Sequence, residues 1–166
     1  MTFTAAAIDN AFPHHTNEIA QSEAYLGHKW CNYWFHVHHL NTNSGKMSKS
    51  KGEFLTVSLL ESKGYDPVIY RFFCLLSHYR KSLVFTYENL DNAKGAYEKL
   101  VAKIAQLLKA EQGEVDKAAY DKLREGFTAA MDNDINTSLA ITALYDVLKA
   151  CLLYTSPSPR DRSLSR

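Results

Sequence analysis

A histidine and a glutamate four residues apart form the first group of side chains that could do chemistry. In the run His14-His15-Thr16-Asn17-Glu18, His14 and Glu18 share one helix face and can reach one metal ion, whereas His15 lies on another face. An imidazole and a carboxylate suit Zn²⁺, although a zinc ion needs at least a third ligand. The alternative is an ordinary helix pair in which Glu18 accepts a hydrogen bond from His14, and the spacing alone favours that alternative.

A basic run forms the second group. Lys46-Met47-Ser48-Lys49-Ser50-Lys51-Gly52 combines three lysines with two serines and a glycine and has no acidic residue. Such a loop can close over a polyphosphate and place positive charge where negative charge develops on the leaving oxygens. Taken alone, the run fits a solvated basic turn better. A single predicted strand separates it from the first group, and this short separation favours a shared site.

The elements that would position these groups follow from the hydrophobic pattern. We expect a helix after Phe12-Pro13 that ends near Gly27, because proline suits the start of a helix and glycine its end. Alternating residue types from Trp30 to Leu40 predict a strand. His36 and His38 would share one side of that strand, which leads into the basic loop.

Helices are expected to dominate the rest of the chain. Thr56 can cap a short helix to Leu60, and Asp66 can cap another that begins at Pro67. After about Ser82 the composition predicts helix throughout. Three helices joined by short polar links would form a bundle, and they span Glu88 to about Leu108, Asp116 to Met131, and a segment capped by Asn136 or Thr137 that carries Leu148.

Two of these helices have an apolar face that we expect to be buried. In the helix after Pro67 the face consists of Ile69, Phe72, Phe73 and Leu76. In the helix from Glu88 it consists of Leu90, Ala93, Tyr97, Leu100, Val101, Ile104 and Leu108.

The composition limits the classes of protein to consider. The 166 residues are 46% hydrophobic and include 10 Tyr, 8 Phe and 2 Trp, which is enough for one modest core and excludes disorder over most of the length. The net charge of +1 indicates no nucleic-acid or membrane partner, so any basic patch must be local. No apolar run approaches the ~20 residues that cross a bilayer. The cysteines form no CxxC pair, which favours reduced thiols and a cytoplasmic protein, with Cys31 and Cys74 buried.

Several segments resemble the cysteinyl-tRNA synthetases, which are class I aminoacyl-tRNA synthetases. Residues 46–50 match the Lys-Met-Ser-Lys-Ser signature loop of class I in full. Residues 12–22 match the cysteine family's Phe-Pro-His-His-Glu-Asn-Glu-Ile-Ala-Gln-Ser except at Thr16, and this match makes the resemblance specific to cysteine. The resemblance runs from Ile8 to Ala150, and it includes residues 71–73, 78–80 and 131–137.

The resemblance implies an α/β remnant, the end of a class I Rossmann-type catalytic domain, followed by an all-α helical bundle. The chain would be mostly helical. Its expected parts are the C-terminal part of the catalytic domain with the signature loop (1–55), a connecting stem-contact segment (56–87), an incomplete helical tRNA-binding domain of the DALR type (88–150) and a non-native tail (151–166). The tail, rich in serine, proline and arginine, resembles the translated read-through of a transposase adaptor used in sequencing libraries.

The resemblance also implies an activity, the ATP-dependent conversion of cysteine to cysteinyl-adenylate and its transfer to tRNA(Cys). Lys46 and Lys49 would be catalytic, and His14 and Glu18 would be zinc ligands. ATP would be bound, with Mg²⁺ sharing its charge, by Lys46, Met47, Ser48, Lys49 and Ser50. In the family two cysteine ligands and a His-x-Gly-His motif lie upstream, and neither occurs before Cys31 here. We therefore expect a truncated chain that is inactive alone, from an intact enzyme that is a cytoplasmic monomer without a membrane partner.

Other roles stay open at this point. His36 aligns with a histidine that recurs in the family's strand, and His36 and His38 could line the adenylate pocket. His38 and His39 are equally well explained as partly buried histidines bonded to the backbone. Three basic residues could contact tRNA phosphates, although solvation explains them better: Lys29, Arg80 and Lys81.

Two alternative functions also stay open. The first is a cysteine ligase that passes activated cysteine to an amino-sugar, as in mycothiol-type biosynthesis. The second is a non-catalytic helical RNA-binding module. Acidic residues outnumber basic ones from Glu88 to Lys149, which disfavours the second alternative. The segments 78–80 and 131–137 favour the tRNA enzyme over the first.

Overall fold

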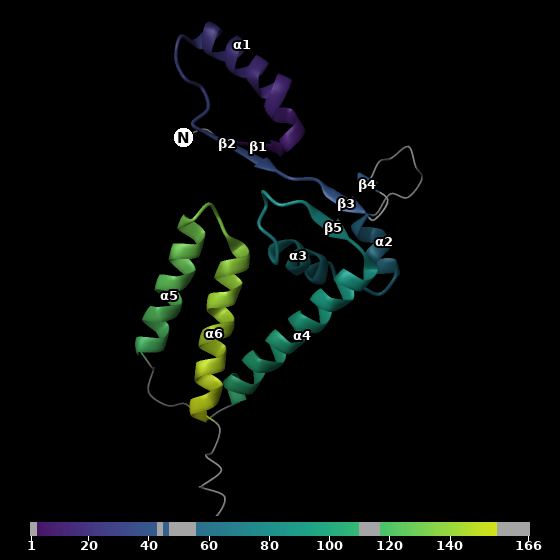
Figure 1. The fold of residues 1–166 in the computed structure, drawn as a ribbon, viewed down its shortest axis with the longest axis vertical. Coiled ribbons are helices and arrows are strands. Elements are labelled where there is room, and N and C mark those ends of the chain that lie inside the picture. The colour runs from purple at the N-terminus through teal and green to yellow at the C-terminus, as the bar shows by residue number, and fades with distance from the viewer. Residues whose placement is uncertain (1–2, 43–44, 47–55, 110–116, 156–166) are drawn as a thin grey trace, which may run out of the picture. The chain divides into compact units, whose positions relative to one another are not determined.

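A computed structural model describes residues 3–42, 45–46, 56–109 and 117–155. The chain divides into two compact units. The first consists of Met1–Thr56 and Tyr79–Thr86, and the second of Val57–His78 and Tyr87–Arg166. Figure 1 labels the helices and strands of both units. Among the described residues no helix is long and apolar enough to span a membrane.

The first unit begins with a strand–helix–strand arrangement. Its elements are β1 (Phe3–Ala7), the short helical turns η1 (Ile8–Asn10) and η2 (Ala11–His15), α1 (Thr16–Leu26) and β2 (Tyr33–Val37). The two strands are parallel, and their register runs from Phe3 opposite Tyr33 to Ala7 opposite Val37. Parallel strands need a long connection, and the helical segment supplies it. The expected helix is confirmed, with Gly27 in the left-handed conformation at its end (φ 70°).

The expected strand from Trp30 to Leu40 is in fact two strands. β2 ends at Val37, and β3 (Leu40–Thr42) belongs to a different sheet. The chain leaves the first sheet after Val37, and the backbone N–H of His38 donates to the carbonyl of Tyr79 at 2.9 Å. The prediction that His36 and His38 share one side of a continuous strand is therefore wrong.

The second sheet of this unit has the order β4-β3-β5. β4 (Gly45–Lys46) pairs antiparallel with β3, whereas β5 (Leu83–Phe85) pairs parallel with it. The Asn41 side chain adds a hydrogen bond of 2.7 Å from Nδ2 to the hydroxyl oxygen of Ser82. The expectation of helix throughout after Ser82 is wrong at β5, because a three-residue strand has no pattern of its own and forms only beside its partner.

The second unit is helical, as expected. Its helices are α2 (Val57–Ser62), α3 (Pro67–Leu75), α4 (Tyr87–Lys109), α5 (Lys117–Asp132) and α6 (Thr137–Thr155). The cap at Asp66 is confirmed, because its carboxylate accepts a hydrogen bond of 2.8 Å from the N–H of Val68. Asn136 caps α6 by accepting from the N–H of Leu139 at 3.2 Å. α6 continues through Thr155, so it includes the first five residues of the expected tail 151–166.

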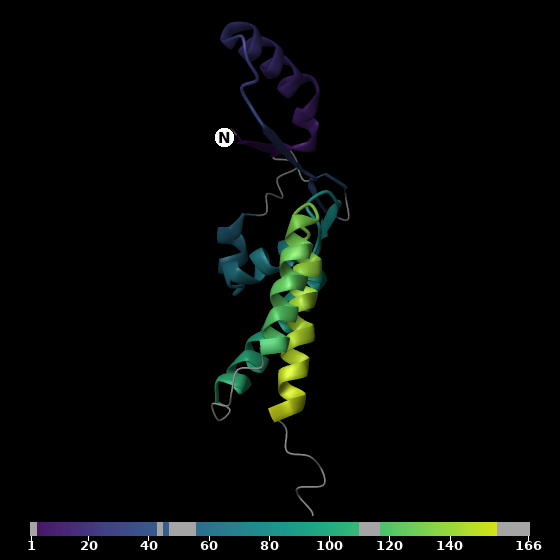
Figure 2. The ribbon, with the colours of Figure 1, turned by 90° about the vertical axis from the view of Figure 1, so that its left-hand side faces the viewer.

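The core of this unit lies where α2, α3 and the first half of α4 meet. The expected apolar face of α3 is buried except at Leu76, which is 39% exposed. α4 crosses the α5–α6 pair obliquely (Figures 1 and 2), so only part of its own face is covered. The buried side chains of these three helices are Leu60, Ile69, Phe72, Phe73, Leu90, Ala93 and Leu100.

The far end of the predicted α4 face is exposed, contrary to expectation. Val101 and Leu108 are 45% and 82% exposed. α6 meets α4 near its middle, where the Tyr145 hydroxyl donates to the carbonyl of Ala96 at 3.1 Å and Lys103 lies 5.6 Å from the Tyr145 ring centre. A helical stripe identifies a face that can be buried, whereas its burial depends on how far a neighbouring helix extends along it.

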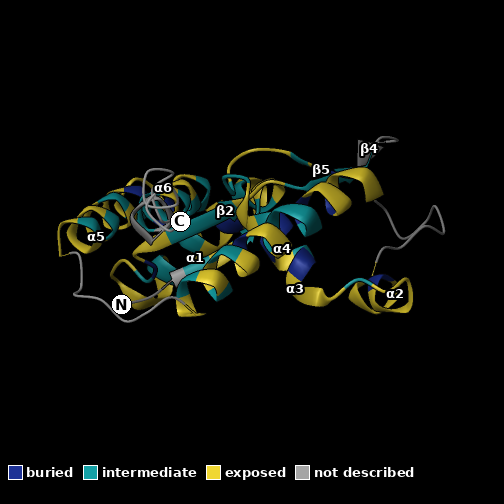
Figure 3. Ribbon diagram, turned by 90° about the horizontal axis from the view of Figure 1, so that it is seen from below, coloured by how far each residue is buried: buried dark blue, intermediate teal, exposed yellow. Residues whose placement is uncertain are grey.

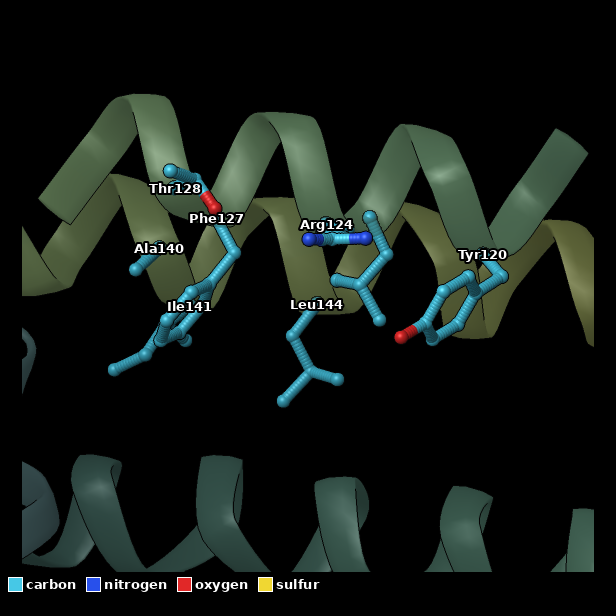
Figure 4. A pocket seen from close by; sticks show the side chains of 8 residues that line it. Tyr120, Arg124, Phe127, Thr128, Ala140, Ile141 and Leu144 are labelled. Atoms are coloured by element: carbon cyan, nitrogen blue, oxygen red, sulfur yellow. The ribbon is translucent and has the colours of Figure 1, made fainter. Parts of the chain in front are cut away.

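An apolar groove lies along α5 and α6. It has a volume of about 410 Å³, and Phe127, Ile141 and Leu144 project to the same side of the two helices (Figure 4). Figure 3 shows exposed positions along both helices. The lining is completed by Tyr120, Leu123, Arg124, Thr128 and Ala140.

The turn between α5 and α6 carries the segment 131–137. Asp134 and Ile135 both adopt left-handed backbone conformations, with φ of 57° and 55°, which is strained for a β-branched residue. Two contacts join the turn to the end of α3. The Thr137 hydroxyl donates to the carbonyl of Leu75 at 2.8 Å, and His78 Nε2 lies 3.8 Å from an Asp134 carboxylate oxygen.

Replacing Leu90 with alanine should lower the free energy of unfolding by about 3 kcal/mol, because this side chain is fully buried and its removal leaves a cavity. Urea unfolding followed by circular dichroism measures the change. Leu108→Ala is the matched control on the same helix, and its effect should stay within about 0.5 kcal/mol because Leu108 is 82% exposed. Equal effects of the two substitutions would contradict the described core.

Alkaline pH should destabilise the second unit through Tyr70. Burial, with a smaller contribution from Cys74, raises the pKa of Tyr70 to about 12. An unfolded tyrosine has a pKa of about 10, so the folded state holds this proton more tightly. Its stabilising contribution is complete below about pH 10 and is lost as the pH rises toward 12. Urea unfolding across this pH range should show that the free energy of unfolding falls as the pH rises. Tyr70→Phe should weaken this pH dependence. An unchanged pH dependence in the variant would contradict the burial of the Tyr70 side chain.

Candidate functional site

The candidate site lies at the carboxyl edge of the β1–β2 sheet. Both strands run in the same direction, so the segments that follow β1 and β2 leave the sheet at the same edge. η1, η2 and the start of α1 follow β1, and the residues after Val37 follow β2 (Figure 1). Ligands of open α/β sheets bind outside the carboxyl ends of parallel strands. Most of the histidines singled out from the sequence are carried to this edge.

His14 and Glu18 lie on either side of the start of α1. His15 and Thr16 between them have helical backbone angles, so the two candidate ligands are about one helical turn apart. The Thr16 hydroxyl donates to the carbonyl of Pro13 at 2.8 Å and closes the turn. Both His14 and Glu18 are exposed to solvent. They are therefore placed where an external ligand could reach them.

The donor set fits Zn²⁺ in type but not in number. Imidazole and carboxylate are zinc ligands, and two of them define only half of a four-coordinate site. Within the described part of the chain, no group of three or more His, Cys, Asp or Glu side chains could hold a metal ion. Any further ligands would have to come from outside the described ranges.

His15 is a residue of this edge whose surroundings could not be predicted from the sequence. Its ring is buried, with 6% of the residue exposed, and its Nδ1 lies 2.9 Å from Nε2 of His36 on β2. The ring also packs against Trp34, with ring centres 4.6 Å apart. Its place next to His14 in the sequence gave no indication of this, because the partner lies 21 residues further along the chain.

The two histidines after β2 have different surroundings. The backbone of His38 bonds to Tyr79, and its side chain is exposed. The Nε2 atom of His39 lies 3.4 Å from a carboxylate oxygen of Asp9 on η1. This contact joins the segment after β2 to the segment after β1 at the same edge of the sheet. His39 is partly buried, as expected, and the contact with Asp9 gives its ring a side-chain partner that the sequence did not indicate.

The segment 79–82 forms a second group of contacts in this unit. The Tyr79 ring stacks on Phe35 of β2 with centres 4.0 Å apart, and the Arg80 Nε donates to the Tyr79 hydroxyl at 3.0 Å. Arg80, Lys81 and Lys29 are all exposed, and a contact with tRNA phosphates stays a prediction for each. Cys31 is buried, as expected, whereas Cys74 of the second unit is only partly buried.

The basic loop begins directly after β4. Lys46 is the last residue of that strand, and its backbone lies opposite Asn41 of β3. Met47, Ser48, Lys49 and Ser50 lie outside the described residues, so their predicted role in binding ATP stays a prediction. The β3–β4 pairing nevertheless fixes where the loop leaves the sheet.

Comparison with known protein families decides the family. A sequence model described as "tRNA synthetases class I (C) catalytic domain" matches residues 1–95, which is more than half of the chain. The chain belongs to the class I cysteinyl-tRNA synthetase family. A second model, of the DALR domain, matches residues 126–162. The expected combination of the end of a class I catalytic domain with a DALR-type helical domain is confirmed. The finer division at residues 55, 87 and 150 stays a prediction.

Curated proteins named cysteine–tRNA ligase are similar to this member of the family over most of its length. The protein of Thermococcus gammatolerans is 41% identical over 88% of the chain, and that of Hahella chejuensis is 41% identical over 95%. The protein of Lactococcus lactis subsp. cremoris is 44% identical over 83%. The chain spans about a third of the length of these relatives, since the matched parts make up 33%, 33% and 30% of them.

Proposed function

We propose that this chain is part of a cysteine–tRNA ligase, which activates cysteine with ATP and transfers it to tRNA(Cys). The observation that carries the proposal is the placement of His14 and Glu18 at the carboxyl edge of the β1–β2 sheet, in a chain of the cysteinyl-tRNA synthetase family. Relatives that carry the name cysteine–tRNA ligase support the same activity.

In this proposal His14 and Glu18 supply two ligands for Zn²⁺. Both side chains are exposed at one helical turn, so neither has to leave a packed core in order to bind. Zinc bound there would take the thiolate of cysteine in preference to the hydroxyl of serine. An apolar pocket separates such near-isosteres poorly, so these ligands would determine the choice of amino acid.

The basic loop would act on the nucleotide. The carboxylate of cysteine attacks the α-phosphorus of ATP, a new carboxyl–phosphate bond forms, and pyrophosphate leaves. Lys46 and Lys49 would stabilise the negative charge that develops on the leaving oxygens, with Mg²⁺ sharing this role. Ser48 and Ser50 would donate hydrogen bonds and shape the loop. Lys46 ends β4, so the loop starts from a fixed point on the sheet.

The helical unit favours tRNA over the other candidate acceptors. The DALR-domain match covers α6 and the end of α5, and the relatives are named as tRNA ligases, which supports tRNA(Cys) rather than an amino-sugar as acceptor. The match to the catalytic-domain model and the names of the relatives also support an enzyme rather than a separate RNA-binding module. We further propose that the intact enzyme acts as a monomer in the cytoplasm.

Pyrophosphate exchange tests this proposal. The purified 166-residue chain should show no cysteine-dependent exchange of pyrophosphate into ATP, because the described residues supply too few metal ligands. Grafting residues 8–150 into the Lactococcus lactis relative, in place of the matching segment, should give a chimera with cysteine-dependent exchange. Exchange by the isolated chain would overturn the expectation of an incomplete site. A folded chimera without exchange would count against the proposed function.

A further inference from the structure

His15 is the buried polar side chain that the proposed reaction does not use, and no other polar side chain is buried among the residues that the structure describes. Burying an imidazole costs free energy unless its nitrogens are hydrogen-bonded. His36 supplies that partner at 2.9 Å. The pair joins the start of α1 to β2, and these are the two elements that form the candidate site.

The bond also limits the protonation of both rings. In a neutral imidazole one nitrogen carries a proton and the other has a lone pair. Nδ1 of His15 and Nε2 of His36 can share a hydrogen bond only if one of them is protonated and the other is not. Two arrangements satisfy this requirement, because either His36 donates from Nε2 to His15 Nδ1 or His15 donates from Nδ1 to His36 Nε2, and each arrangement assigns one tautomer to both rings. The Trp34 ring against His15 restrains the rotation of the His15 ring. His36 keeps a lone pair on Nδ1 only when it donates from Nε2, because in the reverse arrangement Nδ1 carries the proton.

We propose that His15 is a positioning residue for this site. In this proposal Nδ1 of His15 accepts a hydrogen bond from Nε2–H of His36, which leaves the lone pair of His36 Nδ1 for the ligand, and the same bond ties the turn that carries His14 and Glu18 to strand β2. The identity of the ligand rests on the proposed function. The hydrogen bond and the tautomer do not, so the two can fail separately.

The test uses the 166-residue chain labelled with ¹⁵N in its histidines. Long-range ¹H–¹⁵N correlation spectra distinguish protonated from unprotonated ring nitrogens. In the wild type, His36 should show a single tautomer. His15→Phe keeps a ring against Trp34 but removes the bond, and His36 should then become a mixture of tautomers. His15→Asn keeps a hydrogen-bonding group near the position of Nδ1 and should restore the single tautomer.

The control is His28→Phe, just beyond the other end of α1, where the exposed His28 has its Nδ1 3.0 Å from the carbonyl oxygen of Lys29. This substitution should leave His36 unchanged. If His15→Phe fails to fold, as judged by near-ultraviolet circular dichroism, the variants His36→Gln and His36→Leu replace it. The measured quantity is then the tautomer of the His15 ring. Glutamine keeps a group near the position of Nε2 and should preserve the His15 tautomer, whereas leucine should not. A mixture of tautomers at His36 in the wild type, or no response to His15→Phe, would overturn the proposal.

Cobalt titration gives an independent second measurement. With Co²⁺ alone as the probe, His15→Phe should weaken binding about tenfold, as loss of a supporting partner commonly does, and His15→Asn should weaken it less. Equal weakening by both variants would mean that packing rather than the hydrogen bond positions the site, which would contradict the proposal. Absence of Co²⁺ binding by a wild-type chain with a single His36 tautomer would count against the proposed metal ligands and leave the positioning role supported.

Discussion

Lys49→Ala, introduced into the chimera that carries residues 8–150, should lower the rate of cysteine-dependent pyrophosphate exchange on the order of 10²-fold or more. The ammonium group of Lys49 would lie beside oxygens that become more negative only as pyrophosphate leaves. Removing one such stabilising group typically costs a factor of 10² to 10³ in kcat. Because the interaction strengthens in the transition state, the loss should appear in kcat more than in the KM for ATP.

Lys51→Ala is the matched control for this substitution. It removes the same charge from the same basic run, one residue beyond the five-residue signature. We expect it to change the rate only a few-fold. A similar loss from both substitutions would indicate that the net charge of the loop matters rather than a placed ammonium group. An unchanged kcat in Lys49→Ala would contradict the assigned role.

The double substitution His14→Ala and Glu18→Ala should strongly reduce the preference of the chimera for cysteine over serine. A site that recognises a polar group directly rejects the analogue by on the order of 10⁴, whereas shape alone gives about 10² between near-isosteres. The ratio of kcat/KM for the two amino acids should therefore fall about 100-fold. Activity with cysteine should fall at the same time, because the sulfur loses its binding site.

Control substitutions at and just beyond the C-terminal end of α1 separate this effect from helix stability. Glu23→Ala in the last turn of α1 and His28→Ala just after its C-cap remove the same two residue types and should leave the ratio unchanged. Equilibrium dialysis should show that the double variant has lost zinc while the control has kept it. Retained discrimination in a folded variant without zinc would mean that some other feature selects cysteine.

Elements with a local signal could be predicted from the sequence. The α1 and α3 helices start and stop at residues whose chemistry favours helix ends, such as Asp66 before Pro67 and Gly27 after Leu26. β1 and β5 could not be predicted. The alanine-rich Phe3–Ala7 has weak strand propensity, and Leu83–Phe85 is too short for a pattern, so both strands depend on partners far away in the sequence.

The extent of burial was also decided by tertiary packing. The apolar stripe of α4 correctly identifies Leu90 and Leu100 as buried residues, yet it continues to Leu108, which is exposed. The stripe is a property of the helix, whereas coverage depends on where α3 and α6 cross it. An oblique crossing covers a short length of a long helix.

By itself, the sequence determined which residues can do chemistry. The i, i+4 spacing of His14 and Glu18 and the lysines of the basic loop are local features, and helix geometry or charge explains them directly. Only the tertiary structure decided that His15 is buried, that it bonds to His36, and that His39 meets Asp9. Each of these contacts joins residues 21 or more positions apart, and only the parallel pairing of β1 and β2 brings such residues to one edge. Helix geometry relates side chains that are about one turn apart in the sequence. Sheet pairing can bring together residues at much larger separations along the chain.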